Sequence, residues 1–190
     1  MLYVIGGASG AGKTTLLPLL KRSRPDVQWH DFDERWTGGG KRERQELTQG
    51  WVQSALEHGR GFGLLGQCPL GELLAVPGAP LLAGLRHLLL DVGDVERVRR
   101  LRRRGDGQDT QETLNWAAWL RVHQTLPDWR PDVLTEGGWE EMRWERWRGH
   151  PRPDWPGSTL DASGLTPDQT ASRVLAWMDA EAPLAVSPPP

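Results

Sequence analysis

Residues 7–14 of the 190-residue chain read Gly7-Ala8-Ser9-Gly10-Ala11-Gly12-Lys13-Thr14, and this glycine-rich segment is its most specific motif. A short apolar, partly β-branched run, Leu2 to Ile5, precedes it, and a helical pattern from Lys13 to Arg22 follows it. Backbone N–H groups of a glycine-rich loop at a helix N-terminus are fixed donors for phosphate oxygens. The sequence therefore predicts a P-loop that binds a nucleoside triphosphate.

Each residue type in this loop has a physical task. Gly10 and Gly12 let the backbone approach the phosphates and adopt positive φ angles, while Lys13 reaches the β- and γ-phosphates. The hydroxyl of Thr14 is expected to coordinate Mg²⁺. The alternative, a chance glycine-rich turn, is disfavoured by the strand before it and the helix after it. We expect the nucleotide to contact Gly7, Ala8, Ser9, Gly10, Ala11, Gly12, Lys13, Thr14 and Thr15.

Strand and helix patterns alternate along the rest of the chain. Strands are predicted over 27–31, 62–67, 85–91 and 158–161, and helices over 41–59, from Asp94 on, over 108–126 and over 166–180. Such alternation predicts an α/β fold with a parallel five-stranded sheet flanked by helices, a three-layer sandwich of the P-loop NTPase and nucleotide-kinase kind. We expect one domain over 1–183 and a proline-rich tail over 184–190.

Composition excludes several classes of protein. No apolar run reaches the roughly 18 residues that span a bilayer, and Leu2 to Ile5 lacks the regions of a secretory signal, so no membrane partner is expected. Cys68 is the only cysteine, which favours a reducing compartment and a cytoplasmic location. The net charge of −2 offers no bulk attraction for nucleic acid. The oligomeric state is left open.

The P-loop alone does not name a reaction, because GTPases and large ATPases also carry one. A GTPase should contain an Asn-Lys-x-Asp guanine reader, and this sequence has none. The run Leu88 to Asp91 matches the apolar stretch plus aspartate of a second magnesium motif, but the arginine-rich helix directly after it better suits another role. A magnesium role for Asp91 is therefore the weaker alternative.

An acidic pair, Asp31 and Asp33, follows the second strand, and an arginine-rich helix follows the fourth. With the P-loop at the N-terminus, the chain resembles the small P-loop kinases, among them nucleoside, shikimate, gluconate and chloramphenicol kinases. The resemblance covers roughly residues 1–105 and 158–180. It implies that Asp31 or Asp33 binds the acceptor or acts as its base, with Asp31 favoured as the base. The alternative is that both residues cap the following turn.

The resemblance also implies a lid-like helix over 95–105. Helical spacing puts Arg97, Arg100 and Arg104 on one face, and we expect Arg100 and Arg104 to stabilise the transferring charge. The alternative is a solvated face in which the long side chains cover apolar neighbours. Nucleotide base preference stays open between ATP and GTP.

The acceptor pocket is the least readable part of the sequence. We expect residues 34–60 to form a helical segment on the acceptor side, with Trp36 stacking on a planar acceptor and Gln67 reading one of its polar groups. Residues 106–157 form a Trp-rich insertion, helical and irregular, whose tryptophans are expected mainly in the core.

Taken together, these features predict a magnesium-dependent phosphotransferase. It would move the γ-phosphoryl group of ATP or GTP to a hydroxyl or phosphate of a small molecule, such as a nucleoside or nucleotide. The alternative is a nucleotide-binding regulator that transfers no phosphate and binds a partner through the Trp-rich segment.

Overall fold

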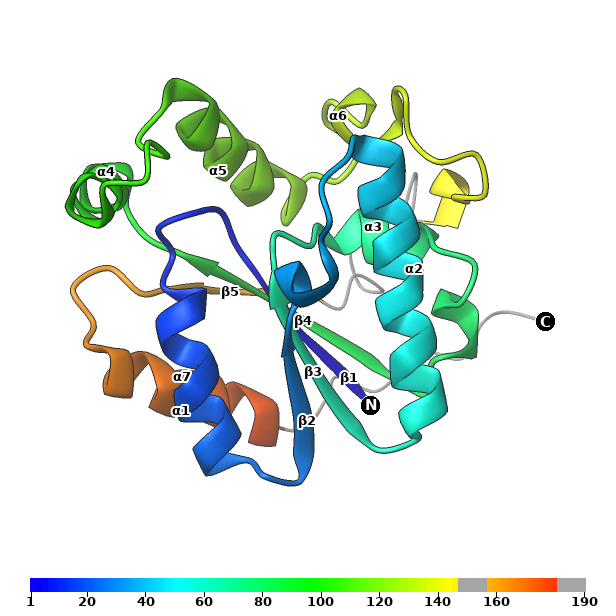
Figure 1. Ribbon diagram of the computed structural model, residues 1–190, viewed down its shortest axis with the longest axis horizontal. Coiled ribbons are helices and arrows are strands. Elements are labelled where there is room, and N and C mark those ends of the chain that lie inside the picture. Colours follow the sequence, from blue (N-terminus) through cyan, green and yellow to red (C-terminus); the bar gives the residue numbers. More distant parts are fainter. Residues whose placement is uncertain (147–156, 181–190) are drawn as a thin grey trace.

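The computed structural model describes residues 1–146 and 157–180, and its centre is a five-stranded sheet (Figure 1). The strand order is β2-β3-β1-β4-β5, and all four pairings are parallel. The predicted parallel five-stranded sheet is confirmed. The strands are β1 (Leu2–Gly6), β2 (Val27–Asp31), β3 (Gly61–Gly66), β4 (Leu85–Asp91) and β5 (Gly157–Asp161).

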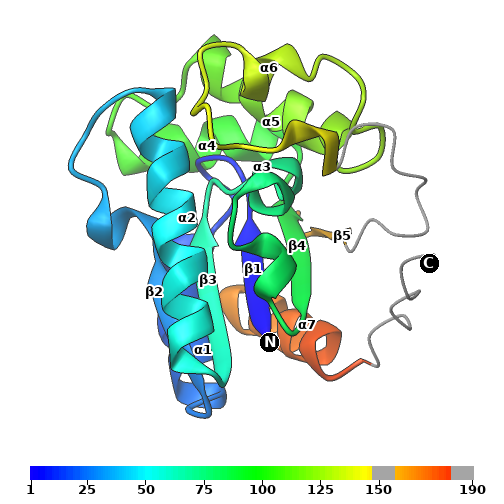
Figure 2. The same ribbon diagram turned by 90° about the vertical axis from the view of Figure 1, so that its right-hand side faces the viewer.

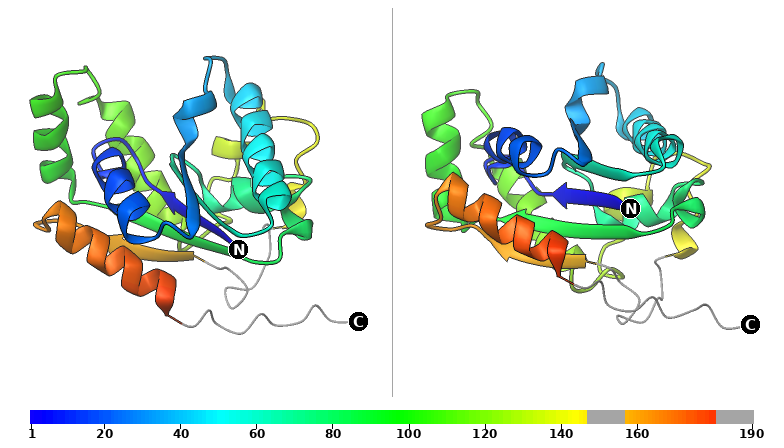
Figure 3. Two further views of the ribbon diagram at one scale, coloured as in Figure 1. Left: turned by 60° about the horizontal axis from the view of Figure 1, so that its bottom comes forward. Right: turned by 90° about the horizontal axis from the view of Figure 1, so that it is seen from below.

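Helices cover both faces of the sheet, which gives the predicted three layers (Figure 3). The helices α1 and α7 pack together on one face, while α2 and α3 pack together on the other. Sequence periodicity predicted α1, α2, α4, α5 and α7 but not the short α3 and α6. The helices are α1 (Lys13–Ser23), α2 (Lys41–His58), α3 (Leu70–Ala75), α4 (Asp94–Arg104), α5 (Gln111–His123), α6 (Asp132–Thr135) and α7 (Pro167–Asp179). Short 3₁₀ helices span Phe32–Arg35, Ala79–Leu81 and Trp144–Arg146.

Adjacent strand residues divide the core into two clusters. Val4 and Leu64 belong to the cluster under α2 and α3, whereas their chain neighbours Ile5 and Leu65 belong to the cluster under α1 and α7. Side chains on a strand alternate between faces, so a strand covered on both sides must be apolar throughout. This is why β1, β3 and β4 appear in the sequence as continuous apolar runs.

The carboxyl ends of the parallel strands all lie at one edge of the sheet. The P-loop follows β1 at the centre of that edge, and α4 and α5 lie at the same end of the molecule (Figure 2). Ligands of open α/β sheets bind at this edge. The topology therefore brings the P-loop, the end of β2, the end of β3 and helix α4 together.

The Trp-rich insertion packs against the cluster under α2 and α3. Trp116 and Trp119 stack at 5.2 Å between ring centroids, and Trp119 is 6% exposed. Gln45 of α2 is fully buried and bonds to the insertion twice, to the Leu134 carbonyl at 3.1 Å and from the Trp139 N–H at 2.6 Å. Trp119 is thus a core residue, Trp116 and Trp139 are partly buried against the core, and Trp129 of the same insertion is 51% exposed.

Two predicted regions extend beyond the described residues. The part of the insertion over 147–156 and the whole proline-rich tail over 184–190 lie outside them. Within the described residues, no helix is long and apolar enough to cross a membrane.

Candidate functional site

The P-loop joins β1 to α1 through glycines in the left-handed region. The φ angles are +81° at Gly10 and +106° at Gly12, and Gly12 is the N-cap of α1. A side chain at Gly10 would also come within 3.1 Å of Arg97 and Leu101 beneath the loop. No side chain caps α1, so its first N–H groups are the available donors at this end of the helix.

Lys13 begins α1 and turns back over the loop. Its Nζ donates hydrogen bonds to the carbonyl oxygens of Gly7 at 2.6 Å and Ala8 at 3.1 Å. Burial lowers the pKa of Lys13 from 10.5 to about 8, because a buried ammonium loses hydration, while the nearby carboxylates of Asp31 and Asp33 partly oppose that shift. Lys13 is therefore still mainly cationic at neutral pH and can bind phosphate.

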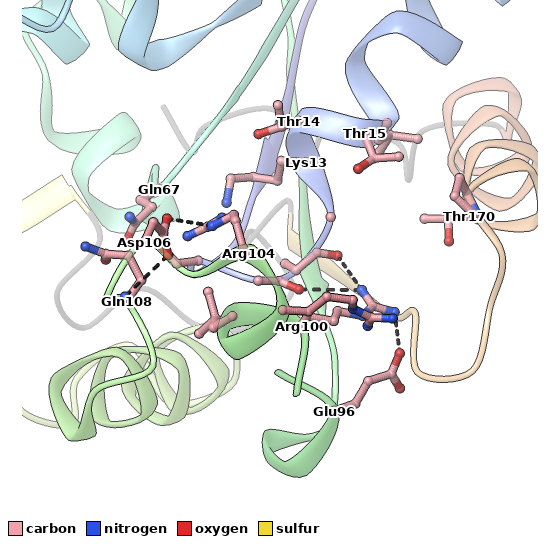
Figure 4. Close-up of a pocket in the computed structure, with 18 of the residues that line it drawn as sticks. Lys13, Thr14, Thr15, Gln67, Glu96, Arg100, Arg104, Asp106, Gln108 and Thr170 are labelled. Carbon is pink, nitrogen blue, oxygen red and sulfur yellow. Dashed lines mark hydrogen bonds and ion pairs between the residues drawn. The ribbon is translucent and has the colours of Figure 1, made fainter. Parts of the chain in front are cut away.

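A cavity of about 1050 Å³ surrounds the loop (Figure 4). It is lined by the P-loop with the first turn of α1, by the ends of β2 and β3, by α4 with the loop after it, and by the start of α7. The lining residues outside the P-loop and α1 are Asp31, Asp33, Gln67, Glu96, Arg100, Leu101, Arg103, Arg104, Asp106, Gln108, Leu165, Pro167 and Thr170.

Asp31 and Asp33 sit in a tight turn at the end of β2. The Oδ1 atom of Asp31 accepts a hydrogen bond from the Asp33 N–H at 3.0 Å, so Asp31 caps the 3₁₀ helix that follows. The capping alternative is thus realised for Asp31, and both side chains still line the cavity. Gly66 makes this turn possible, because a Cβ there would lie 2.4 Å from the Cβ of the buried Phe32.

Arg97 does not face the cavity, although helical spacing grouped it with Arg100 and Arg104. It is fully buried, and its guanidinium donates to the Ser9 carbonyl at 2.7 Å and to the Val92 carbonyl at 3.2 Å. It also forms an ion pair with Asp91. Arg97 therefore holds the P-loop from behind.

Asp91 forms ion pairs with two arginines. Besides Arg97, the Nη1 atom of Arg121 lies 3.3 Å from its carboxylate, and Asp91 does not line the cavity. The magnesium role considered for Asp91 is not supported, because the carboxylate is already neutralised behind the loop.

Arg100 and Arg104 lie in different parts of the cavity, Arg100 beside Glu96 and Arg104 beside Asp106 (Figure 4). Arg100 pairs with Glu96 and lies within 3.5 Å of the carbonyl oxygens of Gly10, Ala11 and Ala162, between the P-loop and the loop after β5. Arg104 is more exposed and pairs with Asp106 at 2.6 Å. Arg104 thus shares its side of the cavity with Gln67, Asp106 and Gln108.

Of the two residues expected to contact the acceptor, Gln67 lines the cavity and Trp36 does not. Trp36 follows the 3₁₀ helix and does not line the cavity. The sequence analysis did not identify several lining residues, among them Glu96, Asp106, Gln108 and Thr170. The only available signal was the Gly105-Asp106-Gly107 sequence after the arginine run, which marks a turn next to the expected phosphate site.

No family model and no curated protein matches this sequence. Several solved structures, however, have a similar fold. The tunicamycin resistance protein of Deinococcus radiodurans superposes with a TM-score of 0.58 at 17% identity, covering 99% of this chain and 98% of that one. A sugar kinase from Janibacter sp. HTCC2649 gives 0.57 at 15% identity, with 98% of each chain covered.

A third structure, thymidylate kinase from Candida albicans, gives a TM-score of 0.53 at 12% identity and covers 94% of this chain and 90% of that one. This chain has the fold of the small P-loop kinases. The resemblance inferred from the P-loop, the acidic pair and the arginine helix is confirmed at the level of fold. At these identities the likeness concerns the fold alone.

Proposed function

We propose that this protein is a magnesium-dependent phosphotransferase that moves the γ-phosphoryl group of ATP or GTP to a hydroxyl or phosphate of a small molecule. One observation carries the proposal. Lys13, at the end of a glycine-rich phosphate loop, opens into the same cavity as Asp31 and Asp33. A phosphate-binding cation and an acceptor-binding carboxylate in one cavity are the parts that phosphoryl transfer needs.

The residues of the chain divide the reaction between them. The N–H groups of the P-loop and the ammonium of Lys13 bind the β- and γ-phosphates, for which Lys13 exchanges its bonds to the Gly7 and Ala8 carbonyls. Asp31 accepts the proton of an acceptor hydroxyl as its oxygen attacks the γ-phosphorus. Arg104 stabilises the charge on the transferring group once it leaves Asp106.

Magnesium fits the oxygen donors at this site. Mg²⁺ prefers oxygen ligands, keeps several waters, and is usually held by one or two protein groups together with substrate phosphates. Thr14 is exposed and lines the cavity, so its hydroxyl can be the protein ligand while phosphates and waters supply the others. When bound with the triphosphate, the ion would neutralise charge on the phosphates. Among the described residues, no cluster of three or more His, Cys, Asp or Glu side chains could hold a metal by itself.

The phosphate site is tested by the substitution Lys13→Met, with Lys21→Met on the exposed face of the same helix as the control. A charge-assisted hydrogen bond contributes about 1.5–3 kcal/mol, so Lys13→Met should weaken Mg-ATP binding roughly 10- to 100-fold in calorimetry. Lys21→Met should leave the affinity unchanged. Equal affinities of the two variants would remove Lys13 from the phosphate site.

The base is tested by Asp31→Asn beside Asp33→Asn, because both carboxylates line the cavity. An amide cannot accept the acceptor proton, so Asp31→Asn should lower turnover about 100-fold or more while Mg-ATP affinity is retained. A larger loss in Asp33→Asn would assign the base to Asp33. If nucleotide bound to the wild-type protein and no acceptor were phosphorylated, a nucleotide-dependent regulator would be the better description.

A further inference from the structure

Polar side chains predominate in the part of the cavity beside Arg104, although Leu101, one turn before Arg104 in α4, also lines the cavity. Leu165 and Pro167 line the cavity at the start of α7, and the loop before them contacts Arg100 and Glu96 through the Ala162 carbonyl and the Gly164 N–H. Among the described residues, the half beside Arg104 and the end of β2, here called the acceptor half, carries carboxylates, carboxamides and guanidinium groups. Its side chains are Asp31, Asp33, Gln67, Arg104, Asp106 and Gln108.

The aromatic side chains next to this half are engaged elsewhere. Phe32, between the two aspartates, is fully buried, and Trp51 is 1% exposed. The indole N–H of Trp51 donates to the Phe32 carbonyl at 3.2 Å, and the Arg35 guanidinium carbon lies 3.8 Å from the centre of its ring. No aromatic residue of the described chain lines the acceptor half. A planar base would find no face on which to stack there.

Charge in the acceptor half also disfavours a phosphate-bearing acceptor. The cavity lining includes the carboxylates of Asp31, Asp33 and Asp106 and the guanidinium groups of Arg103 and Arg104, and Arg104 already pairs with Asp106. Neither Asp31 nor Asp33 forms an ion pair with a described residue. These two carboxylates are acceptor-only groups, so they favour a ligand that donates hydrogen bonds.

We infer that the phosphoryl acceptor is a compact polyhydroxylated compound, neutral or carrying an amine, such as a sugar, a cyclitol or their amino derivatives. This inference rests on the proposed phosphotransferase function. One hydroxyl of the acceptor gives its proton to Asp31 as its oxygen bonds to the γ-phosphorus, and the bond from that phosphorus to the β-phosphate oxygen breaks to release the diphosphate. Asp33, Gln67 and Gln108 bind the remaining hydroxyl or amino groups.

Three sets of acceptors test the inference, each incubated with Mg-ATP and the wild-type protein. The first contains hexoses, hexosamines, cyclitols and aminocyclitols, the second nucleosides, and the third nucleoside monophosphates. Phosphorus NMR of the products should show a phosphate monoester with a member of the first set alone. Transfer to a nucleoside or a monophosphate instead would overturn the inference and leave the kinase proposal standing. No transfer to any set, with Mg-ATP bound, would overturn both.

A pair of variants tests which side chains recognise the acceptor. Asp33→Asn removes a carboxylate from the acceptor half, whereas Asp109→Asn removes one outside the cavity that pairs with Arg102. Since a hydrogen bond to a charged group is lost, Asp33→Asn should raise the KM of an amine-bearing acceptor about 10-fold and leave the KM of ATP unchanged. Asp109→Asn should change neither. Equal acceptor KM values in both variants would contradict recognition by Asp33.

Discussion

The two ends of helix α4 use the same side chain in opposite ways. Of the six arginines in this helix, Arg97 near its start has no exposed surface and contacts the P-loop backbone, Asp91 and Val92. Arg104 at its end is 46% exposed and pairs with one carboxylate on the next loop. Burial decides the difference, because a buried guanidinium must have fixed partners whereas an exposed one can exchange them.

Arg97 can position the P-loop, whereas Arg104 can contact a ligand in the cavity. Arg97 can hold Ser9 in place but cannot reach a ligand without breaking the core, since it does not line the cavity. Arg104 lines the cavity and gives up only a partly exposed ion pair when it moves. We therefore expect substitutions at the first end to affect stability and substitutions at the second end to affect turnover.

The largest effect is expected for Arg97→Met. The change leaves Ser9 without its donor and removes one of the two cations beside Asp91. Breaking a buried ion pair costs about 3–5 kcal/mol, and the lower end applies here because Arg121 still neutralises Asp91. Urea unfolding should show the loss, and Mg-ATP affinity should fall with it because the loop is no longer held.

Arg99→Met is the matched control, since Arg99 is exposed on the same helix. Its free energy of unfolding should change by less than about 0.5 kcal/mol. Similar stabilities of the Arg97 and Arg99 variants would mean that the two ends of α4 do not differ as the comparison requires.

The difference between Arg97 and Arg104 also marks the limit of sequence reasoning. The sheet, the P-loop and α4 could be predicted, because apolar runs, a glycine motif and helical periodicity are local patterns. The spacing of Arg97, Arg100 and Arg104 indicated one shared face, but not that the P-loop covers the first of them. That depends on how β1 and β4 pair, which brings residues about 90 positions apart into contact.

The acceptor half was hard to predict for the same reason. Gln67 was found because it follows a strand, and the carboxyl edge of a parallel sheet is a general binding site. Asp106 and Gln108 belong to a loop whose path is set by α4 and α5. The Gly105-Asp106-Gly107 sequence marks a turn there, but no local pattern shows that this turn lines the cavity. Trp36 was selected for its aromatic ring, a property that does not fix its direction.

The second-largest effect is expected for Arg104→Ala, with Arg102→Ala as the control. Arg102 is 73% exposed, pairs with Asp109 and does not line the cavity. Removing a donor that stabilises transition-state charge typically lowers turnover about 100-fold, whereas a surface ion pair contributes less than about 1 kcal/mol to stability. Steady-state kinetics should show the loss for Arg104→Ala alone, and urea unfolding should show little change for either variant. Equal turnover in both variants would assign Arg104 to a solvated surface.

The smallest expected effect is the pH dependence of nucleotide binding at Lys13, the P-loop cation that lines the same cavity as Arg104. Burial, with a smaller contribution from the charge of Arg97, lowers the pKa of Lys13 to about 8, and a bound triphosphate should raise it again. Above pH 8 the free protein loses a proton that the complex retains. Binding should then take up a proton, and affinity should fall by up to about tenfold per pH unit.

Calorimetry at pH 9 in two buffers of different ionisation enthalpy measures this uptake, which should approach one proton for the wild-type protein and vanish in Lys13→Met. Cys68 does not interfere, because burial raises its pKa to about 12.

The stability of the unliganded protein gives an independent check on the direction of the Lys13 pKa shift. Since the pKa of Lys13 is lower in the folded state than in the unfolded chain, the unfolded chain binds more protons between about pH 8 and pH 10.5. The contribution of Lys13 to the free energy of unfolding should rise across that range, and a flat profile identical to that of Lys13→Met would mean that the ammonium is as well solvated as the exposed arginines at the end of α4.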